Sequence, residues 1–102
     1  MTRLTLILPV LLLTLLIWNP AYSADFQKGV DAYNSGDYAT ALREWKPLAE
    51  QGNAGAQFNL GLMYGDGQGV PQNYKTAIKW FRLAAKQGHP RAQEQVEFLR
   101  KK

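Results

Sequence analysis

The sequence Tyr-Ala-Thr-Ala-Leu at residues 38–42 recurs at residues 74–78 as Tyr-Lys-Thr-Ala-Ile, an offset of 36 residues. The same offset relates Trp45 to Phe81, and the Gln-Gly pair at 51–52 to the pair at 87–88, without a gap. Self-similarity at a fixed period of roughly 20–50 residues indicates a repeat architecture. The repeat therefore decides the fold.

Apolar residues in each copy are spaced as on one face of a helix. In the first copy they fall at positions 38, 41, 42, 45, 48 and 49, and the second copy keeps these offsets. Asp37 and Asn73 stand where a short polar side chain caps a helix N-terminus. Gly52 and Gly88 stand where a left-handed residue ends a helix. We therefore expect one helix between Asp37 and Gly52 and another between Asn73 and Gly88.

Each of these helices has a predicted partner upstream, at residues 25–34 and 54–64. A tight turn at 35–37 joins the first pair, and a glycine-rich loop at 65–72 joins the second. Residues 90–99 begin a third copy, in which Val96 and Leu99 match the core positions Leu60 and Met63 and form a cap. The predicted fold is all-α, with five helices in about two and a half antiparallel hairpins. The domain spans 24–102, divided into 24–52, 53–88 and 89–102.

The second hairpin contains Ala-Gln-Phe-Asn-Leu-Gly-Leu-Met-Tyr at 56–64, Gly-Gln-Gly-Val-Pro-Gln-Asn-Tyr at 67–74, Ala-Ile-Lys-Trp-Phe at 77–81 and Ala-Ala-Lys-Gln-Gly at 84–88. Through these residues it resembles a Sel-one-like repeat. The first hairpin is similar to the related tetratricopeptide repeat, through Gly29, Gly36, Tyr38, Ala41 and Trp45. The resemblance implies a short right-handed α-solenoid that serves as an adaptor or scaffold for a protein or peptide.

Residues 1–23 are predicted to be a signal peptide. A positive start at Arg3 precedes a nearly unbroken apolar run at 4–18, and small residues at 21 and 23 suit a signal peptidase. The run is short for a bilayer, which needs about 20 residues, although an uncleaved anchor is the alternative. We expect cleavage after Ser23 or Ala24, a periplasmic or secreted protein, and no stable membrane insertion after cleavage.

Charge is distributed unevenly along the chain. Residues 24–67 hold three basic and six acidic side chains, whereas residues 68–102 hold eight basic and two acidic ones. An anionic surface of the cell envelope would match the basic half, and the alternative is ordinary solvated helix faces. Nucleic acid is not expected as a partner of an exported protein.

Catalytic and metal-binding patterns are missing from the sequence. There is no cysteine and His89 is the single histidine, which leaves almost no ligands for zinc. The loop at 65–69 lacks the preceding strand of nucleotide-binding loops. Ser35 is not followed three residues later by lysine, unlike the nucleophile of β-lactam-binding enzymes. We expect no enzyme activity, no cofactor and no metal.

A groove that binds a partner is predicted on the inner helices, meaning the first helix of each repeat copy. Its candidate residues are the large apolar and aromatic side chains Phe26, Val30, Tyr33, Phe58, Leu62 and Phe98, and the alternative for each of them is a place in the core. The first hypothesis is an exported interaction module that binds a peptide or protein segment. The alternatives are a self-associating structural unit and, last, a cell-wall or β-lactam hydrolase.

Overall fold

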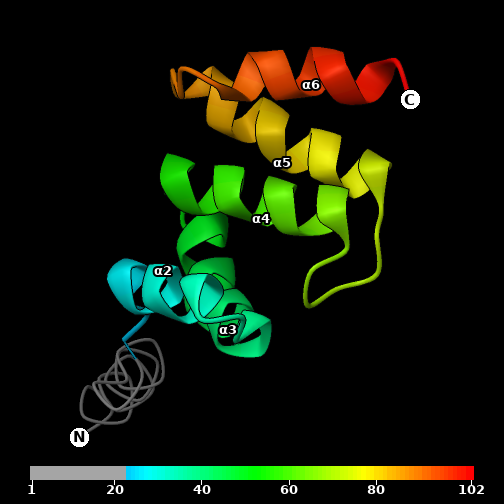
Figure 1. The fold of residues 1–102 in the computed structure, drawn as a ribbon. Coiled ribbons are helices and arrows are strands. Elements are labelled where there is room, and N and C mark those ends of the chain that lie inside the picture. Colours follow the sequence, from blue (N-terminus) through cyan, green and yellow to red (C-terminus); the bar gives the residue numbers. More distant parts are fainter. Residues whose placement is uncertain (1–22) are drawn as a thin grey trace, which may run out of the picture.

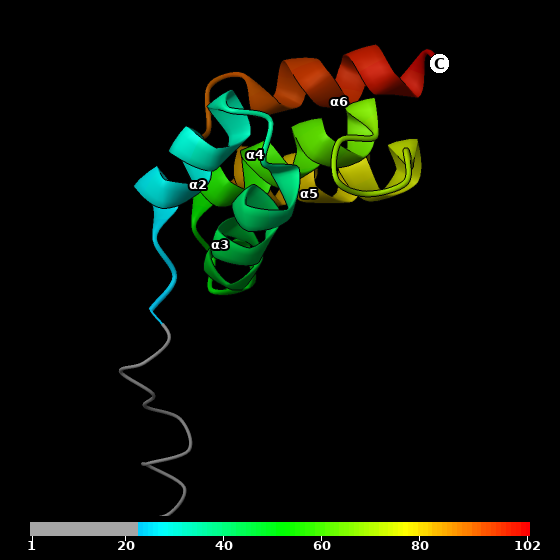
Figure 2. The same ribbon diagram turned by 60° about the horizontal axis from the view of Figure 1, so that its bottom comes forward.

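The computed structural model describes residues 23–102, and all of their regular structure is helical. The predicted signal peptide lies outside the described residues, apart from Ser23. Five helices follow one another, α2 (Phe26–Asn34), α3 (Tyr38–Glu50), α4 (Ala54–Asp66), α5 (Tyr74–Lys86) and α6 (Ala92–Arg100). Each packs chiefly against the next in the chain. Figure 1 shows a stack with α2 and α3 at one end and α6 at the other, and Figure 2 shows the same helices from a second direction. The predicted all-α hairpin repeat is confirmed.

The helix boundaries follow from capping residues. Asp25, Asp37, Asn53 and Asn73 each accept a hydrogen bond from the backbone N–H three residues later, at distances of 2.8–3.2 Å. Just after the C-termini of α3 and α5, Gly52 and Gly88 adopt φ values of 98° and 86°. Both predicted caps and both predicted terminating glycines are thus confirmed.

In each hairpin, a glycine on the first (inner) helix leaves room for an aromatic ring on the second helix. Gly29 of α2 lies against the Trp45 indole, and a Cβ at Gly61 of α4 would come within 2.5 Å of the Phe81 ring. The Trp45 and Phe81 rings are 2% and 1% exposed. The sequence repeat therefore encodes a repeated packing contact, in which the missing side chain lets two helices approach closely.

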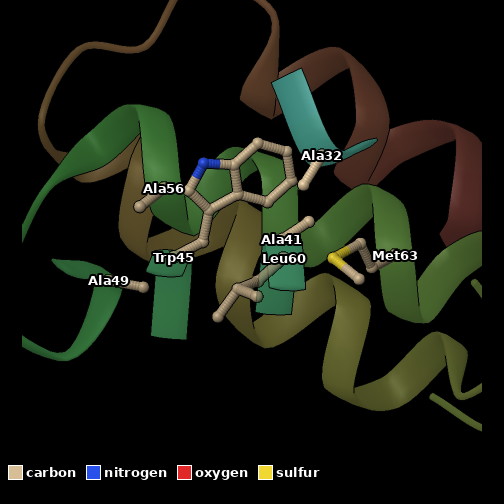
Figure 3. Close-up of a cluster of buried hydrophobic side chains, with 7 residues drawn as sticks. All are labelled: Ala32, Ala41, Trp45, Ala49, Ala56, Leu60 and Met63. Atoms are coloured by element: carbon tan, nitrogen blue, oxygen red, sulfur yellow. The ribbon is translucent and has the colours of Figure 1, made fainter. Parts of the chain in front are cut away.

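The core consists of two apolar clusters that share α4. The first, shown in Figure 3, places the Trp45 indole among small side chains of α2, α3 and α4. Its members are Ala32, Ala41, Trp45, Ala49, Ala56, Leu60 and Met63. The second contains Phe58, Ala77, Phe81, Ala84, Ala92, Val96 and Leu99. Trp80 of α5 packs against the first cluster, so the two hairpins are joined in one continuous core.

One buried amide ties three helices together. Gln57 on α4 is 4% exposed, and its Nε2 donates to the Ala49 carbonyl at the end of α3 at 3.1 Å. Its Oε1 accepts from Nε2 of Gln87, the C-terminal cap of α5, at 2.8 Å. A buried polar group is tolerated here because both ends of the amide are hydrogen-bonded.

Helix α6 has one buried and one exposed face. Val96 and Leu99 are buried in the second cluster, in agreement with their alignment to Leu60 and Met63. Glu94 and Glu97 are exposed on the other side. Glu97 aligns with Gly61 at the 36-residue offset. Helix α6 therefore lacks the glycine that leaves room for an aromatic ring in α2 and α4.

Candidate functional site

A cavity of about 220 Å³ lies between the two inner helices α2 and α4. Val30 of α2 and Leu62 of α4 form its apolar sides, and the buried Trp45 of α3 lies beneath. Val30 and Leu62 occupy matching places in the two hairpins, because both lie four residues after the phenylalanine that opens the pattern in each inner helix. The cavity is thus a direct product of stacking one repeat on the next.

The cavity walls are held by fixed contacts. The Trp45 Nε1 donates to the Phe26 carbonyl at 3.1 Å, and Gly29 leaves room for the ring. Tyr33, whose ring centroid lies 5.6 Å from that of Trp45, also lines the cavity. Because these rings are already positioned, a ligand side chain entering the cavity would not have to order them.

The loop between α4 and α5 braces the Tyr33 side of the cavity. The Tyr33 hydroxyl donates to Oε1 of Gln68 at 2.6 Å, and Nε2 of Gln68 donates to the Tyr38 hydroxyl at 3.3 Å. Burial raises the pKa of the Tyr33 phenol above its usual value; the charges of Asp66 and Tyr38 act in the same direction, while the Gln68 hydrogen bond opposes them. Tyr33 is therefore a neutral hydroxyl at physiological pH.

Two asparagines complete the lining of the cavity, and the sequence analysis missed both. Asn34 lies one helical turn after Val30, and Asn59 lies three residues before Leu62. Residues three or four apart share a helix face, so their spacing to the predicted groove residues was a usable signal. Each side-chain amide can donate and accept hydrogen bonds, which gives the cavity a polar rim.

Phe26 and Phe58 do not line the cavity. Phe26 is half-buried against Trp45, with ring centroids 6.1 Å apart, and lies beside Gly55 of α4. Phe58 is only 6% exposed and belongs to the second core cluster. Its ring stacks on His89 at 4.2 Å between centroids, and the Arg91 guanidinium lies 5.7 Å from the ring centroid. His89, which lies between α5 and α6, thus covers a core aromatic.

Phe98 lies on α6 and is 56% exposed. Its ring is approached by the Lys102 ammonium, whose Nζ is 4.7 Å from the ring centroid. Of the six predicted groove residues, the structure therefore brings together Val30, Tyr33 and Leu62 and leaves the other three outside the cavity.

Residues 23–102 also contain the histidine, the serine and the glycine-rich loop that were considered for other chemistries. No group of three or more His, Cys, Asp or Glu side chains in this part of the chain is arranged to hold a metal ion. The Ser35 hydroxyl donates to the Ala32 carbonyl in its own turn at 2.9 Å. The glycine-rich loop closes back on the first hairpin through Gln68. Within the same residues, no helix is both long and apolar enough to traverse a bilayer.

Comparison with known proteins agrees with the observed repeat. Residues 54–89, which span α4, the loop and α5, match the Sel1 repeat. The Exopolysaccharide production negative regulator of Rhizobium leguminosarum bv. viciae is 34% identical over 74 residues, covering 72% of this chain and 28% of that protein. The protein of the same name from Rhizobium meliloti (strain 1021) is 36% identical over 63 residues, covering 62% and 24%.

A plant protein is also similar to this chain. An F-box protein of Arabidopsis thaliana is 49% identical over 68 residues, which is 67% of this chain and 19% of that protein. The chain thus spans less than a third of the length of each of these relatives. No solved structure gives a significant match.

Proposed function

We propose that this chain, which carries one Sel1 repeat at residues 54–89, is a binding module that holds an apolar side chain of a protein or peptide segment between α2 and α4. Sel1 repeats are generally protein–protein interaction modules. The observation that carries the proposal is the cavity lined by Val30, Tyr33 and Leu62 over the Trp45 ring. No catalytic step is part of the proposed role.

The size and lining of the cavity define the kind of ligand. At about 220 Å³ it falls below the roughly 300–1,000 Å³ of sites that enclose a whole small molecule. It therefore suits one large apolar side chain of a longer segment. Anchoring of this kind carries most of the binding energy in protein interfaces. The amides of Asn34 and Asn59 would bond to the backbone on either side of the anchor, as they stand at the cavity margin.

The proposal includes export to the periplasm or the medium, for which the support is the charged start, apolar run and small-residue site within residues 1–23. The intact mass of the protein from its native host tests this part. A chain beginning at Ala24 or Asp25 supports export, whereas a chain that keeps its first 23 residues contradicts it.

Site-specific photo-crosslinking tests the binding role. A photoreactive amino acid at Asn59, on the cavity margin, should give a discrete adduct in the native cell. The same amino acid at Lys46, exposed on α3 and away from the cavity, is the matched control and should give none. Adding Leu62→Ser to the Asn59 variant should abolish the adduct. Equal adducts from both positions, or none from either in a folded protein, would contradict the proposal.

A further inference from the structure

The charged side chains of residues 67–93 are all basic. These residues contain Lys75, Lys79, Arg82, Lys86 and Arg91, and no Asp or Glu. Four of these five residues lie on α5, which contains no acidic residue at all. The acidic residues before this segment lie instead on and around α2, α3 and the end of α4. The charge of the domain is therefore separated along the stack of helices.

The four cations of α5 form a single stripe. Their spacing of four, three and four residues places them on successive turns of one helix face, over about 16 Å at 1.5 Å per residue. They line a shallow hollow of about 600 Å³ together with Thr76, Ile78 and Leu83. A second hollow, of about 380 Å³, shares Arg82 and Lys86 and reaches Gln93 of α6. The stripe thus continues from α5 toward α6.

The charges of this stripe are not neutralised within the fold. In residues 23–102 the ion pairs are Arg43 with Glu44 and Arg100 with Glu97, and none involves an α5 cation. No residue of α5 lines the cavity between α2 and α4. The stripe is therefore a second surface, independent of the proposed peptide site.

The chemistry of the stripe favours an extended anionic surface. Half-buried Ile78 and Leu83 lie between the cations, so the lysine and arginine stems run beside apolar atoms while their charged ends reach outward. Anionic headgroups that move laterally can gather under such ends at any spacing. Because the opposite half of the domain is acidic, the field would also orient α5 toward the surface. We propose that the α5 stripe docks the domain on a membrane surface of anionic phospholipid.

Vesicle binding measures this directly. The full chain is mixed with vesicles of equal parts phosphatidylglycerol and phosphatidylcholine, or of phosphatidylcholine alone, and the bound fraction is measured by sedimentation. The apolar run at 4–18 is common to every sample, so the ratio between the two vesicle types isolates the charge effect. Removing both charges in Lys79→Gln with Arg82→Gln should lower that ratio about 25-fold, from about fivefold per basic residue.

The matched control removes the same net charge elsewhere. Lys28→Gln with Lys46→Gln alters exposed residues of α2 and α3, and should lower the ratio less than about threefold, because charges far from the surface are screened over a Debye length. Equal losses in the two variants would overturn the stripe as the docking face. Binding to polyglutamate without binding to anionic vesicles would overturn the membrane as its partner.

Orientation gives an independent readout. The chain contains no cysteine, so an environment-sensitive dye can be placed at a single introduced one. Dye on Thr76→Cys, inside the stripe, should shift to the blue on anionic vesicles, whereas dye on Ser35→Cys, in the turn of the first hairpin, should not. The reverse pattern would show that another face docks and would refute the proposal.

Discussion

Replacing Gly61 with alanine tests the packing rule that builds this fold. Alanine normally favours a helix over glycine by up to about 1 kcal/mol. In α4, however, the new Cβ would lie 2.5–2.7 Å from three carbon atoms of the Phe81 ring. That ring is 1% exposed and packed in the second core cluster, so it can move only by displacing its neighbours. We therefore expect the steric cost to exceed the gain in helix propensity.

The magnitude follows from the depth of this overlap. Inserting a carbon into a filled core usually costs about 1–3 kcal/mol, and here the ring must move by several tenths of an ångström or more. We expect Gly61→Ala to lower the free energy of unfolding by about 2 kcal/mol. For a domain of this size, Tm falls by roughly 4–8 °C for each kcal/mol. The expected fall in Tm is therefore roughly 8–16 °C.

Gly65 in the same helix provides the matched control. A Cβ there would meet Ala77 at 3.8 Å and Leu99 at 3.9 Å, which are ordinary contact distances. Gly65→Ala should therefore raise the free energy of unfolding by about 0.5–1 kcal/mol. Urea denaturation and thermal melting of both variants measure the two effects. A Gly61→Ala protein as stable as wild type, or a shared sign for the two variants, would refute the reasoning.

Three further predictions concern capping and core closure. Hydrogen bonds from Thr40, chiefly from its side chain, hold the pKa of Asp37 below its usual value. The stability that this carboxylate adds is therefore present above about pH 3.8 and is lost as the pH falls through the lowered pKa. In urea titrations across this range, the free energy of unfolding should fall less steeply with acid for Asp37→Asn than for the wild type. Gln57→Ala should cost about 1–3 kcal/mol by urea denaturation, because it removes two hydrogen bonds of a side chain that is 4% exposed, one of them to the carbonyl of buried Ala49; an unchanged midpoint would contradict this. Deleting residues 89–102 removes the buried side chains of Val96 and Leu99, worth roughly 1.5–3 kcal/mol each, so an unchanged Tm would show that α6 does not stabilise the stack.

Local signals in the sequence were sufficient for the helices. Capping residues such as Asp37 and Asn73, and glycines such as Gly52 and Gly88, act through hydrogen bonds and backbone angles within a few residues. These features need no knowledge of distant parts of the chain, which is why they were predicted correctly.

The candidate site was predictable only in part, because helix faces differ by small rotations. Phe58 and Leu62 are one turn apart, yet a spacing of four residues still rotates the second side chain by about 40° around the helix. That rotation is sufficient to turn Phe58 into the second core cluster while Leu62 lines the cavity. Only the packed structure separates the two positions, since stacking of His89 on Phe58 joins residues far apart in the sequence.

The loop between α4 and α5 was also predictable only in part from the sequence. The sequence predicts a glycine-rich turn, and the structure contains one, with Gly67 and Gly69 at φ values of 70° and 75°. What the sequence did not reveal is that Gln68 bonds to Tyr33 and Tyr38 of the first hairpin. These contacts join residues 30 or more positions apart, and they depend on how the two hairpins stack.

The most direct test of the proposed function compares two leucine variants. Leu62 and Leu42 are both half-buried in helices and packed against the core, but only Leu62 lines the cavity. The Kd for the partner segment captured through Asn59 is measured for Leu62→Ser and Leu42→Ser at a temperature where both remain folded. The account predicts that Leu62→Ser weakens binding at least tenfold, a loss of about 1.4 kcal/mol, and that Leu42→Ser leaves it unchanged. Unaltered binding by a folded Leu62→Ser protein would contradict it.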